Sequence, residues 1–300
     1  MRFIHPFLAL LFAPLLLGVI NRIKAFAAGR MGPPLLQAYF DIWKLLRKGS
    51  VYSTTTTWVF RAGPVLGLAC MLAALLLLPF GRAGACVAFN GDLLLFVYLF
   101  GLARFATILA ALDTGSSFEG MGASREAYFA ALAEPALLIG LAALARVTQA
   151  WSLSGMFSAL GPAAWRVAGP ALVLVAAAVL VVFLVENARM PVDDPTTHLE
   201  LTMIHEVMVL DHGGPDFALI SYAAALKLWL LGALLVNIVM PVHTASALLN
   251  TGAALAGLLL LAVAVGLIES SMARLRLVRV PELLAGATAL AALAIILVLR

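Results

Sequence analysis

Eight long stretches of the sequence consist almost entirely of apolar residues, and shorter polar stretches separate them. A helix needs about 20 mostly apolar residues to cross the hydrocarbon core of a bilayer. The pattern therefore predicts membrane-spanning helices at residues 4–21, 62–80, 92–112, 130–150, 168–186, 217–240, 249–268 and 282–299. We expect an all-α, polytopic membrane protein that forms a single integral membrane domain over residues 1–300.

The composition agrees with this pattern. Hydrophobic residues make up 64% of the chain and charged residues 11%, whereas an average soluble domain is about 45–50% apolar and about 25% charged. A chain of this size cannot hide so much apolar surface from water, so its solvent is the lipid bilayer. The composition excludes a soluble enzyme, a nucleic-acid-binding protein and a disordered segment.

The lysines and arginines are divided unevenly between the two sets of loops. Twelve of the 19 fall in segments 22–61, 113–129, 187–216 and 269–281, and five fall in the opposite set. Basic loops favour the cytoplasmic side of a membrane. We therefore predict that these four segments are cytoplasmic and that both termini lie outside.

The first of these segments contains an amphipathic pattern. Apolar residues recur at helical spacing, and polar residues lie between them: Leu35, Leu36, Tyr39, Phe40, Trp43 and Leu46 alternate with Gln37, Asp41, Lys44 and Arg47. This pattern is typical of an interfacial helix on the membrane surface. It also fits a helix that docks a partner or lines a ligand site, and the spacing alone leaves both interpretations open.

The second segment is rich in glycine and hydroxyl residues. Residues 112–122 read Leu-Asp-Thr-Gly-Ser-Ser-Phe-Glu-Gly-Met-Gly. This composition predicts an ordered turn or loop and not a helix. The glycines do not form a phosphate-binding pattern that follows a strand.

The third segment holds the densest acidity of the protein, since seven of the 15 aspartates and glutamates fall between residues 186 and 216. Asp194-Pro195 reads as an N-cap followed by a first helical residue. It predicts a helix that runs to about Leu210. The other positions of this helix are mostly apolar, so we expect it to be buried against the bundle.

The sequence supports no metal site in this chain. His205-Glu206 begins like a zinc-protease motif, but Val209 stands where the second histidine would be. His198, His205 and His212 are spaced by seven residues, which separates neighbours by roughly 10 Å in a helix. Cys70 and Cys86 provide no ligand set for zinc or an iron–sulfur cluster.

Charged residues inside the predicted spans need a reason, because a charge at the bilayer centre costs about 2.5–3.5 kcal/mol on insertion scales. Glu134 lies within the fourth span, Glu186 ends the fifth, and Arg104 and Lys227 interrupt the third and sixth. The structural interpretation is a set of buried ion pairs, for example between Glu186 and Arg189. The functional interpretation, which the whole set favours, is a polar path for protons into the membrane.

Several motifs together resemble a known family. The run Glu186-x-x-Arg189-x-Pro191-x-Asp193-x-Pro195, with Glu200-Leu201 four residues further on, is similar to the signature of subunit 1 of respiratory complex I. Arg30-x-Gly32-Pro33 with Gln37, Asp41 and Lys44 resembles that family's first cytoplasmic loop, although one residue is missing before the glutamine. Arg125 and Glu134, nine residues apart, also match. The resemblance covers nearly the whole chain.

A narrower resemblance comes from residues 191–206 and 112–118, which are similar to the membrane subunit of group 4 [NiFe]-hydrogenases, in the form found in hydrogenase-4 and formate hydrogenlyase. Where complex I has two further acids in the third loop, this chain has Thr196 and His198. This departure weakens the case for a standard quinone chamber and favours a complex that delivers electrons to protons.

The resemblance implies roles for particular residues. Six residues would transfer protons: Glu134, Glu186, Glu200, Glu206, His198 and His205. Arg189, Asp193 and Arg125 would order the acidic loop by ion pairing. Arg30, Gln37, Asp41 and Lys44 would face the peripheral arm or a quinone.

The resemblance also implies partners and a location. The subunit would anchor hydrogenase-like large and small peripheral subunits, which hold the [NiFe] centre and iron–sulfur clusters, and would contact antiporter-like subunits in a bacterial or archaeal cytoplasmic membrane. This chain would hold no redox centre, although a quinone site is possible. The leading hypothesis is therefore a proton-coupling subunit; the alternatives are a quinone-site subunit and a structural anchor without a proton role.

Overall fold

A computed structural model describes residues 3–193, 203–240, 244 and 246–299 of the chain. The described residues form ten α helices and two 3-10 helices: α1 (Ile4–Ala27), α2 (Gln37–Leu46), α3 (Trp58–Leu77), α4 (Asp92–Asp113), α5 (Ser117–Thr148), α6 (Leu153–Ala159), α7 (Pro162–Glu186), η1 (Glu206–Val209), α8 (Gly214–Val239), α9 (Ala247–Ser271), η2 (Leu277–Arg279) and α10 (Val280–Leu299). Within them, eight helices are long and apolar enough to cross a membrane. The predicted all-α class and the eight spans are confirmed.

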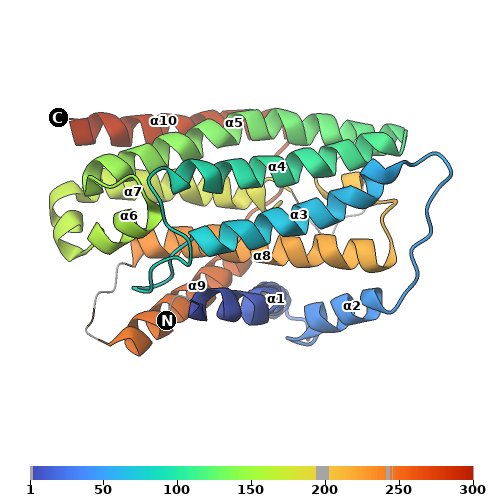
Figure 1. The fold of residues 1–300 in the computed structure, drawn as a ribbon, viewed down its shortest axis with the longest axis horizontal. Helices are drawn as coiled ribbons and strands as arrows, with labels where there is room; N and C mark the ends of the chain where they lie inside the picture. Colours follow the sequence, from blue (N-terminus) through green and yellow to red (C-terminus); the bar gives the residue numbers. More distant parts are fainter. Residues whose placement is uncertain (1–2, 194–202, 241–243, 245, 300) are drawn as a thin grey trace.

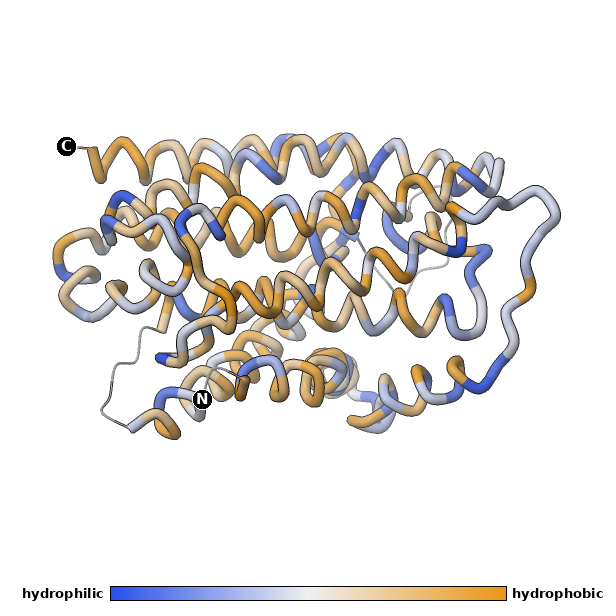
Figure 2. Tube along the Cα trace, in the orientation of Figure 1, coloured by the Kyte–Doolittle hydropathy of each residue, from blue (hydrophilic) through white to orange (hydrophobic). Residues whose placement is uncertain are grey.

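Most of the spanning helices lie side by side in one bundle. Figure 1 shows α3, α4, α5, α7, α8 and α10 running in nearly the same direction, whereas α1 and α9 cross each other at one edge. The loop between α2 and α3 and the turn between α4 and α5 lie at one end of the bundle, and α6 lies at the other. Most residues along the long helices are apolar (Figure 2), as expected of helices that face lipid.

Helix α8 forms the centre of the bundle. Its residues from Leu228 to Ile238 are all buried, and Trp229 is 1% exposed. Helices in lipid gain little from the hydrophobic effect when they associate, so close packing of small residues matters more. A Cβ atom on Gly257 of α9 would lie 2.6 Å from Val236 of α8, and one on Gly266 would lie 2.8 Å from Ile23 of α1. These glycines let α9 approach both neighbours.

Helix α5 begins earlier than the sequence pattern predicts. Residues 117–122, expected to form a loop, are its first turns, and α5 starts at Ser117 and not near residue 130. The prediction was wrong because one face of this part of α5 packs against η1 and α4, so the helix forms without a long apolar run. Glu119 is completely buried there, and it accepts a hydrogen bond from the Asp211 backbone N–H at 3.0 Å.

The acidic segment (residues 187–216) also differs from its prediction. Residues 194–202 lie outside the described residues. Beyond them, residues 203–205 are not helical and residues 206–209 form only the 3-10 turn η1, so the predicted α helix does not reach Leu210 through this stretch. The backbone N–H groups of Ile204 and His205 donate to the Asp193 carboxylate at 3.0 and 3.4 Å. A side-chain carboxylate is therefore the acceptor for these two N–H groups.

Asp113 joins the ends of two spanning helices. Its carboxylate accepts hydrogen bonds from the backbone N–H of Thr57 at 2.6 Å and of Phe60 at 3.3 Å, and from the Thr57 hydroxyl at 2.8 Å. The first N–H groups of a helix have no partner within the helix. Asp113, the last residue of α4, therefore caps the start of α3 and fixes the two helices side by side.

Gly122 of α5 provides the contact surface for η1. A Cβ atom there would overlap the Val207 side chain and lie 3.1 Å from the Ile204 carbonyl oxygen. We predict that Gly122→Ala destabilises the folded chain by about 1–3 kcal/mol, because the acidic segment must move away. The measurement is the thermal unfolding midpoint of the purified chain in detergent.

Gly120 supplies a matched control, since a Cβ atom on it would meet only Leu112 Cδ2 at 4.0 Å. Gly120→Ala should leave the midpoint unchanged or raise it slightly, because alanine stabilises a helix by up to about 1 kcal/mol relative to glycine. Equal midpoints for the two alanine variants would contradict the packing role of Gly122.

His212 is the buried titratable group at the start of α8. It is 7% exposed, its ring stacks on Phe60 at 3.9 Å between centroids, and its Nδ1 atom has no hydrogen-bond partner in the described part of the chain. Burial lowers the pKa of His212 below its usual 6.5, although the charges of Asp216 and Asp211 partly raise it. The folded chain therefore disfavours the protonated imidazole.

We predict from this lowered pKa that the stability of the folded chain depends on pH. The unfolded chain binds the His212 proton near pH 6.5 and the folded chain only at lower pH, so stability should fall as the pH drops below about 6.5. The thermal midpoint at pH 5.5 should lie below that at pH 7.5, and His212→Phe, which keeps the stacking surface, should reduce this difference. An undiminished difference in the variant would assign the pH dependence to other groups.

Candidate functional site: a buried charged network

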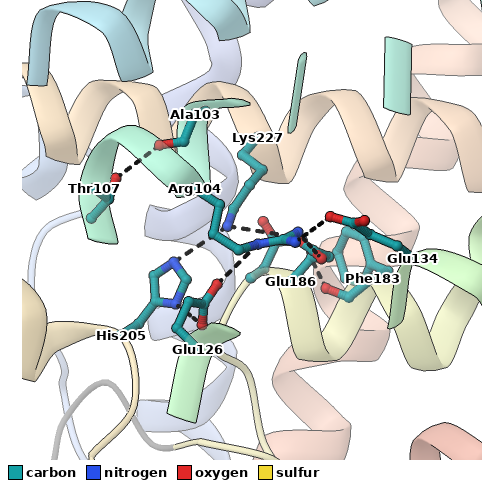
Figure 3. Close-up of polar contacts among 10 residues, drawn as sticks. Ala103, Arg104, Thr107, Glu126, Glu134, Phe183, Glu186, His205 and Lys227 are labelled. Atoms are coloured by element: carbon teal, nitrogen blue, oxygen red, sulfur yellow. Dashed lines mark hydrogen bonds and ion pairs between the residues drawn. The ribbon is translucent and has the colours of Figure 1, made fainter. Parts of the chain in front are cut away.

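Arg104 lies near the middle of α4 and is 9% exposed. Its guanidinium contacts three carboxylates from two other helices (Figure 3). The Nε atom lies 3.2 Å from Glu126 of α5, one terminal nitrogen lies 2.7 Å from Glu134 of α5, and the other hydrogen-bonds to Glu186 at the end of α7. A planar guanidinium with five N–H donors suits this arrangement.

A second cation closes these contacts into a ring. The Lys227 ammonium of α8 lies 3.8 Å from Glu186 and 3.4 Å from Nε2 of His205. Nδ1 of His205 lies 3.0 Å from Glu126. The ring therefore runs from Arg104 through Glu186, Lys227, His205 and Glu126 back to Arg104, and Glu134 branches from it. We call these six residues the charged network.

One arrangement of protons satisfies both hydrogen bonds of His205 when Lys227 is charged. A charged lysine can only donate, so Nε2 of His205 accepts from Lys227. Nδ1 then carries the imidazole proton and donates it to Glu126. With this neutral histidine, three carboxylates face two cations, and the charged network holds one excess negative charge. One added proton would neutralise it.

The charged network extends from the acidic segment toward the outside of the bundle. The side chains of Glu126 and Glu186 are 10% and 7% exposed, whereas His205 is 29% exposed and Glu134 is 37% exposed. A cavity of about 10 Å³ adjoins Arg104, Glu134 and Glu186. This is close to the smallest space that holds one water molecule.

Three of the predicted proton-transfer residues meet in the charged network: Glu134, Glu186 and His205. Glu206 is half-buried and begins η1, one residue after His205. His198 and Glu200 lie outside the described residues.

The residues predicted to order the acidic segment contact its backbone or neighbouring helices. Asp193 binds the N–H groups of Ile204 and His205 and lies 2.7 Å from the Arg274 guanidinium. Arg125 donates a hydrogen bond to the Met203 carbonyl oxygen at 2.9 Å. Arg125 therefore holds the described part of the segment against α5, and Asp193 connects its two ends and joins it to Arg274, which lies between α9 and η2.

The predicted ion pair between Glu186 and Arg189 is wrong. Helix α7 ends at Glu186, and the chain turns at Ala188, whose φ is 48°, so the i, i+3 spacing of a helix does not apply. Glu186 instead pairs with Arg104 and Lys227. Arg189 pairs with Glu269 of α9 at 3.3 Å, and Lys24 of α1 lies 2.9 Å from the same carboxylate.

The basic, amphipathic segment lines a separate cavity of about 500 Å³ between α1, α2 and α8. Gln37, Asp41 and Lys44 contribute to its wall, and the Gln37 amide donates a hydrogen bond to Asp41 at 2.8 Å. Arg189 also lines it, whereas Arg30 is exposed and lies outside the lining. The expectation that this segment faces a quinone or the peripheral arm stays a prediction.

Sequence reasoning missed two buried acids that form ion pairs, Glu126 and Glu269. Glu126 was not selected because it lies in segment 113–129, outside the predicted spans, and Glu269 was counted as part of segment 269–281. Glu119, Glu126 and Glu134 follow one another at intervals of seven and eight residues. This spacing indicates a row of acids on one helix only once α5 is known to begin at Ser117.

Comparison with known proteins connects this geometry to a family. The sequence profile of the NADH dehydrogenase family matches residues 2–300. The chain belongs to the NADH dehydrogenase family. Formate hydrogenlyase subunit 4 of Escherichia coli K12 is a relative that is 33% identical over 277 residues, which cover 90% of this chain and 89% of the relative.

Two further similarities fit this family membership. Hydrogenase-4 component C of Escherichia coli K12 is 31% identical over 232 residues, which cover 77% of this chain and 72% of the relative. A solved chain from the membrane-bound sulfane sulfur reductase, an archaeal respiratory membrane complex, has a TM-score of 0.81 and covers 99% of both chains at 22% identity. The second similarity shows a common fold.

The network's dependence on Arg104 can be tested by substitution. Arg104→Met would leave three carboxylates facing Lys227 alone, and removing one partner of a buried ion pair costs about 3–5 kcal/mol. We predict that Arg104→Met sharply lowers the yield of monodisperse protein after detergent extraction, measured by size-exclusion chromatography.

Two further variants make the result specific. Arg146→Met, which removes an exposed arginine from the last turn of α5, should extract normally. Adding Glu126→Gln and Glu186→Gln to Arg104→Met removes two of the stranded charges and should restore part of the yield. A normal yield from Arg104→Met alone would show that the cation is dispensable.

Proposed function

We propose that this chain is the membrane-anchor and proton-coupling subunit of a multisubunit, energy-converting redox complex of the hydrogenase or complex I type. The subunit would link electron transfer in a peripheral arm to proton translocation through the membrane. The relatives named for formate hydrogenlyase and hydrogenase-4 support the kind of complex. The charged network supports the proton role.

The observation that carries this proposal is the continuous set of polar contacts from His205 to Glu134. His205 belongs to the acidic segment at one end of the bundle, and Glu134 lies within a spanning helix with 37% of its side chain exposed. A carboxylate at that depth in lipid is costly unless a partner subunit or water meets it. The contacts thus connect a loop to a position from which a neighbouring membrane subunit could receive a proton.

The charged network has the chemistry of a proton relay. A proton that reaches Nε2 of His205 forms an imidazolium, which can release its Nδ1 proton to Glu126 over 3.0 Å. The excess negative charge favours uptake of this proton, and the adjacent guanidinium of Arg104 opposes its retention on a carboxylate. A change of charge in the peripheral arm that moves the acidic segment would shift this balance. The Arg104 guanidinium cannot relay a proton, so the step from Glu126 toward Glu134 would pass along water beside Arg104, where the small cavity is close to the size of one water molecule.

The proposed kind of complex also implies the partners of this subunit. The acidic segment and the segment that contains α2 would contact hydrogenase-like large and small subunits, which would hold the [NiFe] centre and iron–sulfur clusters. Antiporter-like membrane subunits would cover the face that exposes Glu134. The basic segments would lie on the cytoplasmic side of a bacterial or archaeal membrane, in agreement with their charge.

Glu126→Gln tests the proton role, because glutamine keeps the size and most hydrogen bonds of glutamate but cannot carry the proton. We predict that proton translocation by the assembled complex, reconstituted in vesicles and normalised to electron transfer, falls about tenfold or more. A loss of this size is expected when a positioned acid–base group is removed. Electron transfer by the peripheral arm should continue, and co-purification of the partner subunits shows that assembly is intact.

Glu282→Gln is the matched control, since Glu282 is an exposed acid at the start of α10 outside the charged network. It should leave translocation unchanged. If Glu126→Gln and Glu134→Gln assemble and still translocate protons normally, the proton role is wrong and the chain is a structural anchor.

A further inference from the structure

The stretch between α9 and η2 contacts the start of the acidic segment at two neighbouring points. One terminal nitrogen of Arg274 lies 2.7 Å from Oδ1 of Asp193. The backbone N–H of Leu275, the next residue, donates a hydrogen bond to the Pro191 carbonyl oxygen at 2.8 Å. A side-chain ion pair and a backbone hydrogen bond therefore attach residues 191–193 to this stretch.

The Asp193 carboxylate has different partners on its two oxygens. Oδ1 faces Arg274, whereas Oδ2 accepts hydrogen bonds from the backbone N–H groups of Ile204 and His205 at 3.0 and 3.4 Å. The contact with the guanidinium is charge-assisted, and such contacts are about twice as strong as neutral hydrogen bonds. Because both oxygens belong to one rigid group, Arg274 fixes the direction in which Oδ2 points.

Burial makes this ion pair matter more than a surface pair. Asp193 is 3% exposed, and the Arg274 side chain is 18% exposed. A surface ion pair contributes little to stability, whereas a buried charge that loses its partner is strongly disfavoured. Without the cation, the Asp193 carboxylate would turn toward water, and the two backbone N–H groups would lose their acceptor.

The position of the His205 backbone decides what its ring can reach. Nδ1 lies 3.0 Å from Glu126, and Nε2 lies 3.4 Å from Lys227 (Figure 3). The second distance is already long for a hydrogen bond, and hydrogen bonds weaken steeply as their geometry worsens. A small backbone shift at His205 would therefore open the ring of the charged network at this residue.

A second ion pair also attaches the start of the acidic segment to α9. Arg189 binds Glu269 of α9 at 3.3 Å. That pair holds the segment near its first residues, whereas the contacts of Arg274 reach His205 through the Asp193 carboxylate. The side-chain connection from the stretch after α9 to the charged network therefore runs through Arg274.

We propose that Arg274 is a positioning residue for proton transfer in the charged network. It holds the Asp193 carboxylate, and that carboxylate holds the His205 backbone where the imidazole reaches both Glu126 and Lys227. The proposal rests on the proton role proposed above for the network. Arg274 itself moves no proton, since its guanidinium stays protonated.

Nitrogen NMR of the purified chain in detergent tests the positioning, because the two ring nitrogens of a neutral histidine show which of them carries the proton. The chain has five histidines, and comparison with His205→Gln identifies the signals of His205. At mildly alkaline pH, we expect wild-type His205 in a single form with the proton on Nδ1. Arg274→Gln should give a mixture of the two tautomers, because the ring is no longer held between its two partners.

Arg276→Gln is the matched control, since Arg276 is an exposed arginine two residues further on, directly before η2. It should keep the single tautomer. Arg274→Met, which cannot hydrogen-bond to Asp193, should change the spectrum at least as much as Arg274→Gln. A single Nδ1–H form in both Arg274 variants, or the same mixture in Arg276→Gln, would overturn the proposal.

Proton translocation by the assembled complex in vesicles, normalised to electron transfer, gives a second readout. Displacing a reacting group by about 1 Å can lower a rate about a hundredfold, so we expect a loss of about tenfold or more in Arg274→Gln and none in Arg276→Gln. Mixed tautomers with unchanged translocation would support the placement of His205 by Arg274 but would contradict the proton role of the network. An unchanged tautomer would overturn the positioning role alone.

Discussion

The contact of Arg104 with three carboxylates is the interaction on which the interior of this protein depends. In a medium where apolar burial contributes little to helix association, an ion contact that joins α4, α5 and α7 supplies both specificity and attraction. It also makes the position of Lys227 acceptable, since Glu186 is shared between the two cations. Each charge of the network is tolerated because the others are present.

The contacts that join the helices are the same contacts to which the proposed proton transfer is assigned. A set of ion pairs that only joined helices would gain from exact neutrality, yet here the neutral form of His205 leaves one negative charge in excess. The ring also includes a residue from outside the spanning helices. The Asp193 carboxylate accepts a hydrogen bond from the His205 backbone N–H, and the His205 ring bonds to Glu126. The position of His205 therefore depends on the position of the acidic segment.

The sequence predicts the spans well because their signal is local. Twenty apolar residues have few alternatives to a membrane helix, so all eight were recognisable, and Glu134 and Glu186 stood out as acids within or at the end of them. The partners of these acids were not predictable. Arg104 lies 30 residues from Glu134 and 82 from Glu186, and only the packing of three helices brings them together.

The failures have the same origin. Residues 117–122 were read as a loop because glycine and serine dominate them, but burial against η1 outweighs their weak helix propensity. Arg189 was assigned to Glu186 because they are neighbours in sequence, whereas the turn at Ala188 directs it to Glu269. Local pattern identifies which residues are unusual, and tertiary structure decides which of them meet.

The order of the charges along the chain has a consequence for biosynthesis. Arg104 is synthesised before every carboxylate that it contacts, so α4 enters the membrane with an uncompensated cation. The mean hydropathy of α4, 2.1 over its most apolar window, helps to offset that cost. Glu126 and Glu134 arrive with the next spanning helix, after a turn of only three residues (114–116). Helices α4 and α5 are thus suited to insert as one hairpin, with the first ion pairs formed before α7 and α8 exist.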